Sequence, residues 1–225
     1  MSAARSFNGA AGGVPAPEIV RLFLALAERG SNAALTDMIV EHGKVLLDMR
    51  DEKGRTALLC ATEAGHSGAL HLLVRNGADI DARDLEGNTS LMIAVQEGFC
   101  SVAQALLDRG ADMELVNNQG QTALHLAASH RNNNDRRHPM SKKKKEAVQL
   151  LLERGAQTTT TDDKGHTPEA WARRFGYHDV ANIIEAEEKR RKEEHAAQIS
   201  VYTEGLPQDV TIPRLRLRHH HGRWR

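Results

Sequence analysis

The sequence predicts an all-α repeat solenoid, and three regularities lead to that fold class. Glycine recurs at a step of 33 residues in Gly54, Gly87 and Gly120. Threonine keeps the same step two positions after each of these glycines, and each copy then carries a pair of leucines. A fixed period of this length is typical of repeat arrays, in which each unit buries its apolar face against its neighbours.

Each copy opens with a turn and a helix start. Asx side chains, which bond their own backbone in turns, stand three residues before the glycine that supplies a positive φ. The turn residues are Asp51, Asp84, Asn117 and Asp162. A threonine then acts as the N-cap of a short first helix, at Thr56, Thr89, Thr122 and Thr167. Only Pro168 places proline at the first helical position, where its fixed φ is favourable.

Two helices follow the turn in each copy. The first contains a small residue that lets neighbouring copies approach closely, at Ala61, Ala94, Ala127 and Ala172. The second carries leucine pairs at residues 72–73, 106–107 and 151–152, which we expect on the buried face. Gly77, Gly110 and Gly155 are expected to end it as left-handed C-caps.

The outer copies depart from this pattern. Residues 1–16 are rich in Ala, Gly and Ser and are predicted to be disordered. Residues 17–50 show two helix-type apolar faces, Ile19/Leu22/Phe23/Leu26 and Leu35/Met38/Ile39, without a turn or threonine. They are interpreted as a degenerate cap. Residues 162–192 are predicted to form a C-terminal cap with a helix extension, and residues 193–225 the helix end and a flexible basic tail.

Between the caps lie copies at residues 51–83, 84–116 and 117–161. The third is longer by 12 residues. Arg131 stands where a glycine should close its first helix. The run RNNNDRRHPMSKKKK follows, so residues 131–145 are predicted to be a basic loop inserted before a second helix that starts at Glu146. Insertions in repeat proteins often form part of the binding face.

The copies resemble the ankyrin repeat. Its pattern D-x-x-G-x-T-P-L-H-x-A-A-x-x-G-H is met by DEKGRTALLCATEAGH, DLEGNTSLMIAVQEGF, NNQGQTALHLAASH and DDKGHTPEAWARRFGY. The resemblance covers residues 17–192 and implies about five helix-turn-helix units with short β-turn fingers. It also implies a non-enzymatic interaction module, an adaptor, scaffold or inhibitor, that holds a partner protein in a concave groove of fingers and first helices.

The resemblance also indicates which positions line that groove. They are the variable residues at the turn tips and at the ends of the first helices. In this chain they are Glu52, Lys53, Arg55, Glu63, Arg83, Leu85, Glu86, Asn88, Gln96, Glu97, Val116, Asn118, Gln119, Gln121, Ser129, His130, Asp163, Lys164 and His166. Leu85 and Val116 are the most informative, because each is an apolar group at a turn tip where solvent is expected.

No motif predicts catalysis or a cofactor. The sequence lacks a phosphate loop, a G-x-S-x-G and an H-E-x-x-H motif. Cys60 is interpreted as a packed core residue, and Thr122 and His125 as a structural pair that ties turn to helix. Three adjacent histidines at 219–221 lack the spacing of a metal site and are interpreted as a solvated tail. No metal, no small-molecule substrate and no membrane span are expected.

Charge leaves one alternative open. The net charge is zero, but residues 17–116 hold 9 basic against 16 acidic residues, whereas residues 117–161 hold 8 against 3. Arg136, Arg137 and Lys142, Lys143, Lys144 and Lys145 fit a nuclear-import patch. We therefore expect a cytoplasmic or nuclear protein. The alternative is a nuclear cofactor associated with nucleic acid through loop 131–145 and the C-terminal tail, which the acidic copies disfavour.

Overall fold

The computed structural model describes residues 15–129 and 142–203. The described elements, in chain order, are α1 (Pro17–Glu28), α2 (Asn32–His42), η1 (Lys44–Asp48), α3 (Ala57–Glu63), α4 (Ser67–Arg75), α5 (Ser90–Glu97), α6 (Cys100–Leu107), α7 (Ala123–Ala127), α8 (Lys142–Glu153), α9 (Pro168–Arg174) and α10 (His178–Thr203). Regular structure in these ranges is thus almost wholly helical, with one isolated β-bridge between Arg83 and Thr89. The predicted all-α class is confirmed.

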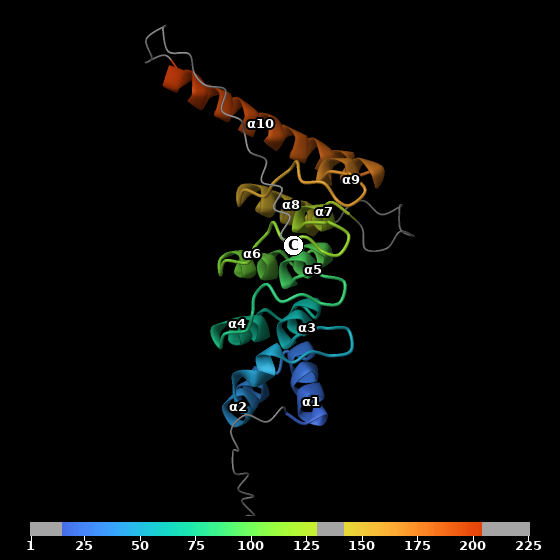
Figure 1. Ribbon diagram of the computed structural model, residues 1–225, viewed down its shortest axis with the longest axis vertical. Coiled ribbons are helices and arrows are strands. Elements are labelled where there is room, and N and C mark those ends of the chain that lie inside the picture. The colour runs from blue at the N-terminus through green and yellow to red at the C-terminus, as the bar shows by residue number, and fades with distance from the viewer. Residues whose placement is uncertain (1–14, 130–141, 204–225) are drawn as a thin grey trace, which may run out of the picture. The chain divides into compact units, whose positions relative to one another are not determined.

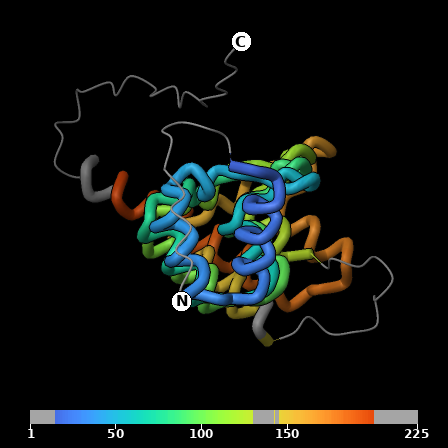
Figure 2. The backbone as a smooth tube through the Cα atoms, turned by 90° about the horizontal axis from the view of Figure 1, so that it is seen from below, coloured from blue at the N-terminus to red at the C-terminus, as the bar shows by residue number. Residues whose placement is uncertain are grey.

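The chain divides into two units, and the boundary falls within α10, between residues 187 and 188. In the first unit, antiparallel helix pairs stack in two columns (Figures 1 and 2). One column contains α1, α3, α5, α7 and α9, and the other contains α2, α4, α6 and α8, each helix packing on the next in its column. The stack matches the predicted solenoid.

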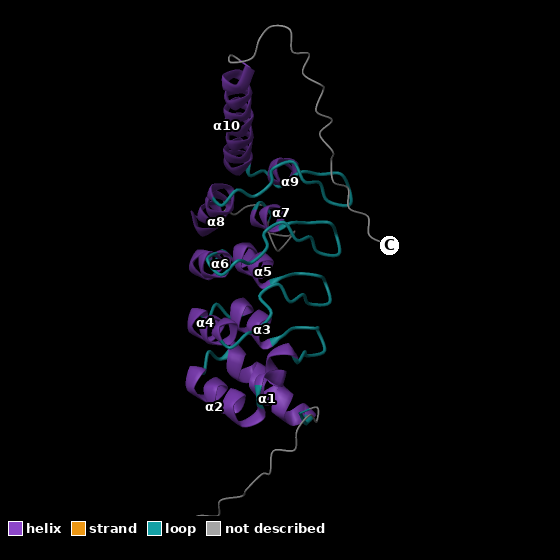
Figure 3. Ribbon diagram, turned by 60° about the vertical axis from the view of Figure 1, so that its left-hand side comes forward, coloured by secondary structure: helices purple, strands orange, loops and turns teal. Residues whose placement is uncertain are grey.

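Four loops project from the first column on the same side (Figure 3). We call them finger 1 (residues 51–55), finger 2 (84–88), finger 3 (117–121) and finger 4 (162–166). Each ends at a threonine that starts the next first helix. The hydroxyls of Thr56, Thr89 and Thr167 accept hydrogen bonds from N–H groups three residues on, at 3.5, 3.4 and 3.2 Å. The sequence-predicted N-caps therefore form, which sets where each finger meets its helix.

The core of the stack consists of leucines between alanines. Leu73, Leu106 and Leu151 of the second helices are completely buried, as are Ala61 and Ala94 of the first helices. Alanine lets two helix backbones approach, and leucine fills the space between the two columns. The buried faces are therefore those that the 33-residue pattern predicts, and they hold the fingers at a constant spacing.

The first helix differs from expectation at one position. The apolar pattern predicts Leu22 on the buried face of α1, but its side chain is 54% exposed. The buried face is centred on Phe23, Leu24 and Ala27 instead. At about 100° per residue, this turns Leu22 away from α3. The apolar periodicity identifies the helix correctly and misplaces the edge of its buried face.

The inserted segment also differs from the prediction. α8 begins at Lys142, four residues before the expected start at Glu146. Lysine is a good helix former, and Lys142 lies 3.8 Å from Glu146 one turn later. Residues 130–141 lie outside the described part of the chain, as do the predicted disordered segment up to residue 14 and the tail from residue 204.

The second unit contains the rest of α10, which reaches Thr203 and so includes residues assigned by sequence to the tail. Its surface carries ion pairs at i,i+4, including Glu188–Lys192 and Lys189–Glu193. Each such pair stabilises an exposed helix by about 0.3–0.5 kcal/mol. The alternating charges therefore account for the helical conformation of this exposed stretch.

Candidate protein-binding groove

The candidate groove is the face formed by fingers 1–4 and the ends of α3, α5 and α7. Adjacent fingers are joined by backbone hydrogen bonds. These run from the N–H of Leu85 to Lys53, of Asn118 to Glu86 and of Asp163 to Gln119, with N···O distances of 3.0, 3.0 and 3.1 Å. Spacing is tight, since a Cβ atom on Gly87 would lie 2.9 Å from the backbone nitrogen of Asn118. The four fingers thus form one connected edge.

Each finger is also closed on itself by its Asx residue. In finger 1 the Oδ1 atom of Asp51 accepts from the N–H groups of Lys53 and Arg55 at 2.9 and 2.8 Å. Burial alone would raise the pKa of Asp51, but the hydrogen bonds from Arg55 and Lys53 outweigh it and lower the pKa. The carboxylate is therefore ionised at neutral pH, and its acceptor atoms hold the turn.

Three residues of the predicted contact surface belong to the interior instead. Asn88, Gln121 and Ser129 are 9%, 4% and 2% exposed. The Asn117 side-chain amide donates to Asn88 Oδ1 at 3.1 Å and to Gln121 Oε1 at 3.0 Å, which ties finger 3 to finger 2. Ser129 donates to the carbonyl of Leu126. A buried amide or hydroxyl must form its hydrogen bonds within the protein. These side chains therefore support the fingers and the first helices.

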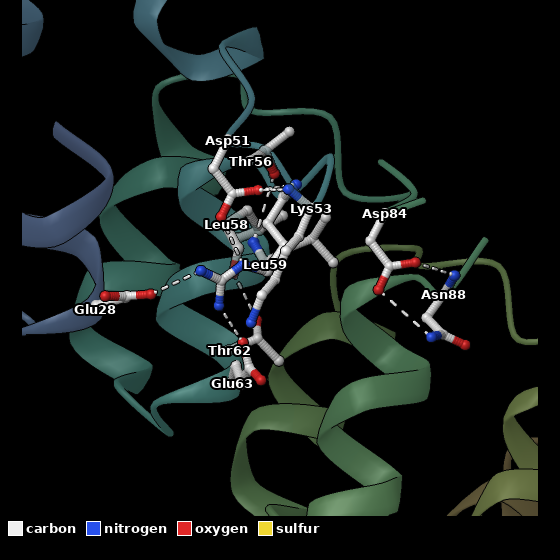
Figure 4. A network of polar contacts seen from close by, with 11 residues as sticks. Glu28, Asp51, Lys53, Thr56, Leu58, Leu59, Thr62, Glu63, Asp84 and Asn88 are labelled. Atoms are coloured by element: carbon white, nitrogen blue, oxygen red, sulfur yellow. Dashed lines mark hydrogen bonds and ion pairs between the residues drawn. The ribbon is translucent and has the colours of Figure 1, made fainter. Parts of the chain in front are cut away.

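Arg55 makes three ion pairs within the groove and behind it. Its guanidinium contacts Asp51 at 2.8 Å, Glu28 at 3.0 Å and Glu63. Figure 4 shows Glu28 of α1, Asp51 of finger 1 and Glu63 of α3 converging on this point. Burial lowers the pKa of Arg55, but the bonds to Asp51 and Glu63 outweigh it and raise the pKa. Three carboxylates around one cation lock finger 1 to two helices.

The remaining predicted residues lie on the surface to different degrees. Exposed side chains are those of Glu52, Lys53, Arg83, Leu85, Glu86, Val116, Asn118, Gln119, Asp163 and Lys164, and half-buried ones are those of Arg55, Glu63, Gln96, Glu97 and His166. Leu85 is 68% exposed and Val116 38% exposed. Arg83 also has a structural bond, from its Nε to the carbonyl of Gly87 at 3.1 Å. His130 lies outside the described residues.

Finger 4 is anchored by a residue whose role the sequence did not predict. Trp171 of α9 donates from its indole nitrogen to Asp162 Oδ2 at 2.8 Å. Its ring also meets His125 edge-on at a centroid distance of 6.5 Å. The repeat motif leaves the position of Trp171 unspecified, and the departure beside it, Glu169 where the family keeps leucine, is compatible with an exposed outer surface. The indole instead fixes finger 4 against its helix.

Cys60 is a buried residue of α3, in keeping with its interpretation as a packed core residue. Burial raises the pKa of the Cys60 thiol to about 12, so the thiol is neutral and a poor nucleophile at neutral pH. Residues 15–129 and 142–203 contain no group of three His, Cys, Asp or Glu side chains placed to hold a metal ion. Over the same part of the chain, no helix combines the length and apolar character needed to cross a membrane.

The basic patch is only partly described. Arg136 and Arg137 lie outside the described residues, whereas Lys142, Lys143, Lys144 and Lys145 belong to the start of α8. The Lys145 ammonium contacts the Asp179 carboxylate of α10, and this contact is the main reason that the pKa of Asp179 is lowered. Lys145 therefore helps to close α8 on the last helix pair.

Comparison with known proteins agrees with this geometry. A family model described as ankyrin repeats in three copies matches residues 16–117 and again residues 91–192. The stacked helix pairs and the connected fingers define a helical repeat protein. The chain belongs to the ankyrin repeat family, whose repeats are generally protein–protein interaction modules.

One human protein shows a shorter similarity. Ankyrin repeat domain-containing protein 29 of Homo sapiens is 43% identical over 54 residues. The match covers 24% of this chain and 18% of that protein. This similarity agrees with the family assignment. The matched segment is a small part of the human protein, so the comparison concerns the repeats alone.

Proposed function

We propose that this chain is a non-enzymatic adaptor, scaffold or inhibitor that binds a partner protein along the groove. The observation that carries the proposal is the backbone ladder that joins all four fingers. It fixes the tips in place while leaving Glu52, Leu85 and Asn118 exposed with no part in the core. A surface that is already ordered loses little conformational entropy on binding, which favours affinity.

Leu85 and Val116 are the apolar contacts of this proposed surface. Leu85 lies in finger 2 and Val116 directly before finger 3, and both expose apolar surface that a partner would remove from water. Clustered apolar anchors surrounded by polar side chains are typical of the centre of a protein interface. We therefore expect these two side chains to contribute more to binding than the charged residues beside them.

The test is a pull-down with the double variant Leu85→Asp and Val116→Asp. We expect it to lose most of the partner recovered by the unchanged protein, because two carboxylates would be desolvated in the interface. Bound proteins are identified by mass spectrometry. Equal recovery with an intact fold would refute the groove assignment.

Val40→Asp supplies the matched control. Val40 is 81% exposed on α2, in the column away from the fingers (Figure 3). The variant introduces the same chemistry outside the groove, so partner recovery should stay unchanged. Circular dichroism and thermal melting of all variants separate loss of binding from loss of fold.

Localisation is part of the same proposal. We propose that the protein works in the cytoplasm or nucleus, and that residues 142–145 contribute to nuclear entry. Changing these four lysines to alanine in a tagged full-length chain should shift it toward the cytoplasm. An unchanged distribution would remove the import role. Because Lys145 contacts Asp179, a second variant that keeps Lys145 controls for loosening of α8.

A further inference from the structure

The cleft between fingers 1 and 2 carries charged groups that finger 3 lacks. It has a volume of about 540 Å³ and lies beside α3 and α5. Four carboxylates and two cations line it: Glu52, Glu63, Asp84, Glu86, Lys53 and Arg55. The lining is therefore acidic overall, and clefts lined by one sign of charge attract the opposite charge.

The cations offset this acidity less than their number suggests. The Arg55 guanidinium already contacts Glu63 within the cleft and two further carboxylates, Asp51 and Glu28, behind it. Glu52 is 3.9 Å from Arg21, but both side chains are largely solvated, at 96% and 79% exposure. Such an exposed pair contributes little energy and is easily exchanged. An incoming cation therefore meets Glu52, whose ion pair with Arg21 is weak, and Glu86, whose Oε2 accepts from the neutral side-chain amide of Asn88 at 3.1 Å.

The same cleft has an apolar component. Leu85 of finger 2 forms part of its lining and is 68% exposed, and Ile93 of α5 also lines it. Carboxylates next to an exposed leucine suit a side chain that combines a cation with an apolar stem or neighbour. Lysine and arginine fit, because their methylene groups cover apolar surface while the charged head stays near carboxylates.

Finger 3 shows that this chemistry is local. Its residues 117–121 carry amide side chains and a glycine, with no charged group. A partner that lies along the groove thus meets carboxylates at one end and neutral amides further on.

We propose that the cleft between fingers 1 and 2 binds a basic segment of the partner protein, in which a lysine or arginine stands beside an apolar residue. This inference rests on the proposed function of the groove and adds the chemical class of the ligand. Glu52 and Glu86 receive the cation, and Leu85 receives the apolar neighbour.

The ligand class is tested by selecting a phage-displayed library of random peptides on the full-length protein. We expect enrichment of lysine or arginine next to Leu, Ile, Val, Met or Phe. A selected peptide, labelled with fluorescein, is then titrated by fluorescence anisotropy. Its affinity should fall as salt is raised, since exposed ion pairs are screened. Selection without enrichment of basic residues, or enrichment of acidic ones, overturns the inference.

The site is tested with Glu52→Gln and Glu86→Gln together. We expect the selected peptide to bind about fivefold more weakly, as two exposed charge contacts are lost. Asp37→Asn with Glu41→Gln is the matched control, because it removes the same charge from exposed positions on α2. Equal weakening in both double variants would mean non-specific attraction and would overturn the assignment to this cleft.

The two proposals can fail separately. If Leu85→Asp with Val116→Asp abolishes partner recovery but the selected peptides are not basic, the groove stands and the basic-segment inference falls. If basic peptides bind the cleft while partner recovery is insensitive to that variant, the groove proposal for the partner falls. The melting temperature of each variant, compared with the unchanged protein, shows that the fold is retained.

Discussion

The imidazole of His125 bonds to the backbone carbonyl of His166, which lies 41 residues further along the chain, at an Nε2···O distance of 3.1 Å. On the other side of the ring, Nδ1 accepts the backbone N–H of Thr122 at 3.1 Å. Nδ1 is therefore an acceptor, and the proton resides on Nε2, which donates to His166. One neutral histidine thus connects the start of α7 to finger 4.

Replacing His125 by alanine should cost about 2–5 kcal/mol in the free energy of unfolding. The change leaves the buried Thr122 N–H without its acceptor, removes one of the two donors to the His166 carbonyl, the other being the Asp162 N–H, and opens a cavity. Urea unfolding followed by circular dichroism measures the loss. His71→Ala, at an exposed position on α4, is the control and should change little. A loss below about 1 kcal/mol would contradict the connection.

The stability of the protein should depend on pH through the same residue. Burial lowers the pKa of His125 in the folded state. The stabilisation by neutral His125 is thus fully present above its unfolded pKa of about 6.5, and it is lost as pH falls through the folded pKa. The difference in unfolding free energy between the unchanged protein and His125→Ala should shrink from pH 7 to pH 5. A constant difference would show that protonation of His125 is not coupled to folding.

Ser90 offers a position where a substitution should stabilise the chain. Its hydroxyl is buried without a hydrogen-bond partner, at the first residue of α5. Thr89 before it has an extended backbone, which a following proline requires, and Pro168 occupies the equivalent position in α9. Ser90→Pro should raise stability by about 0.5–1 kcal/mol.

Thermal melting of the two variants Ser90→Pro and Ser90→Ala separates two causes of stabilisation, the removal of the unbonded hydroxyl and the restriction of the unfolded chain. Alanine removes only the orphan hydroxyl, whereas proline also restricts the unfolded chain. Both midpoints should rise, and that of the proline variant should rise more. A lower midpoint for alanine would mean that the hydroxyl has a partner in solution, such as a buried water.

Packing between the helix columns is tested by Leu106→Ala. Leu106 is completely buried in α6, so its truncation should cost about 2–5 kcal/mol. Leu124→Ala in α7 should behave alike. Leu22→Ala is the matched control, because Leu22 is 54% exposed and its loss should stay within about 0.5 kcal/mol. Chemical denaturation measures all three, and equal losses at Leu106 and Leu22 would mean that the register is wrong.

Much of the fold could be predicted because its signals are local. The spacing from turn residue to glycine to threonine cap lies within six residues, and it recurs in four copies. The start of α8 was missed for a different reason. Lysine and glutamate runs suit an exposed helix as well as a loop, and ion pairs such as Lys142–Glu146 decide between them.

The candidate groove was predicted less completely. Its exposed tips, such as Leu85 and Glu52, followed from their positions in the repeat. Asn88 and Gln121 have the same polar character in the sequence, yet their amides turn inward to bond Asn117. For Asn88 the donor comes from the next finger, so its own repeat does not show that the side chain turns inward. For Gln121 the donor lies four residues earlier in the same finger, and only the folded turn brings the two amides together.

The sequence by itself determined the repeat length, the helix caps, the buried leucines and the family. Only the tertiary structure decided that Arg55 engages three carboxylates, that Trp171 anchors finger 4 and that the first cleft is acidic. The physical reason is the range of the interactions. Caps and helix faces form between residues a few positions apart, whereas side-chain bonds between repeats join residues such as Glu28 and Arg55, 27 positions apart, or Asp108 and Arg154, 46 positions apart. Only the stacking of repeats brings such residues together.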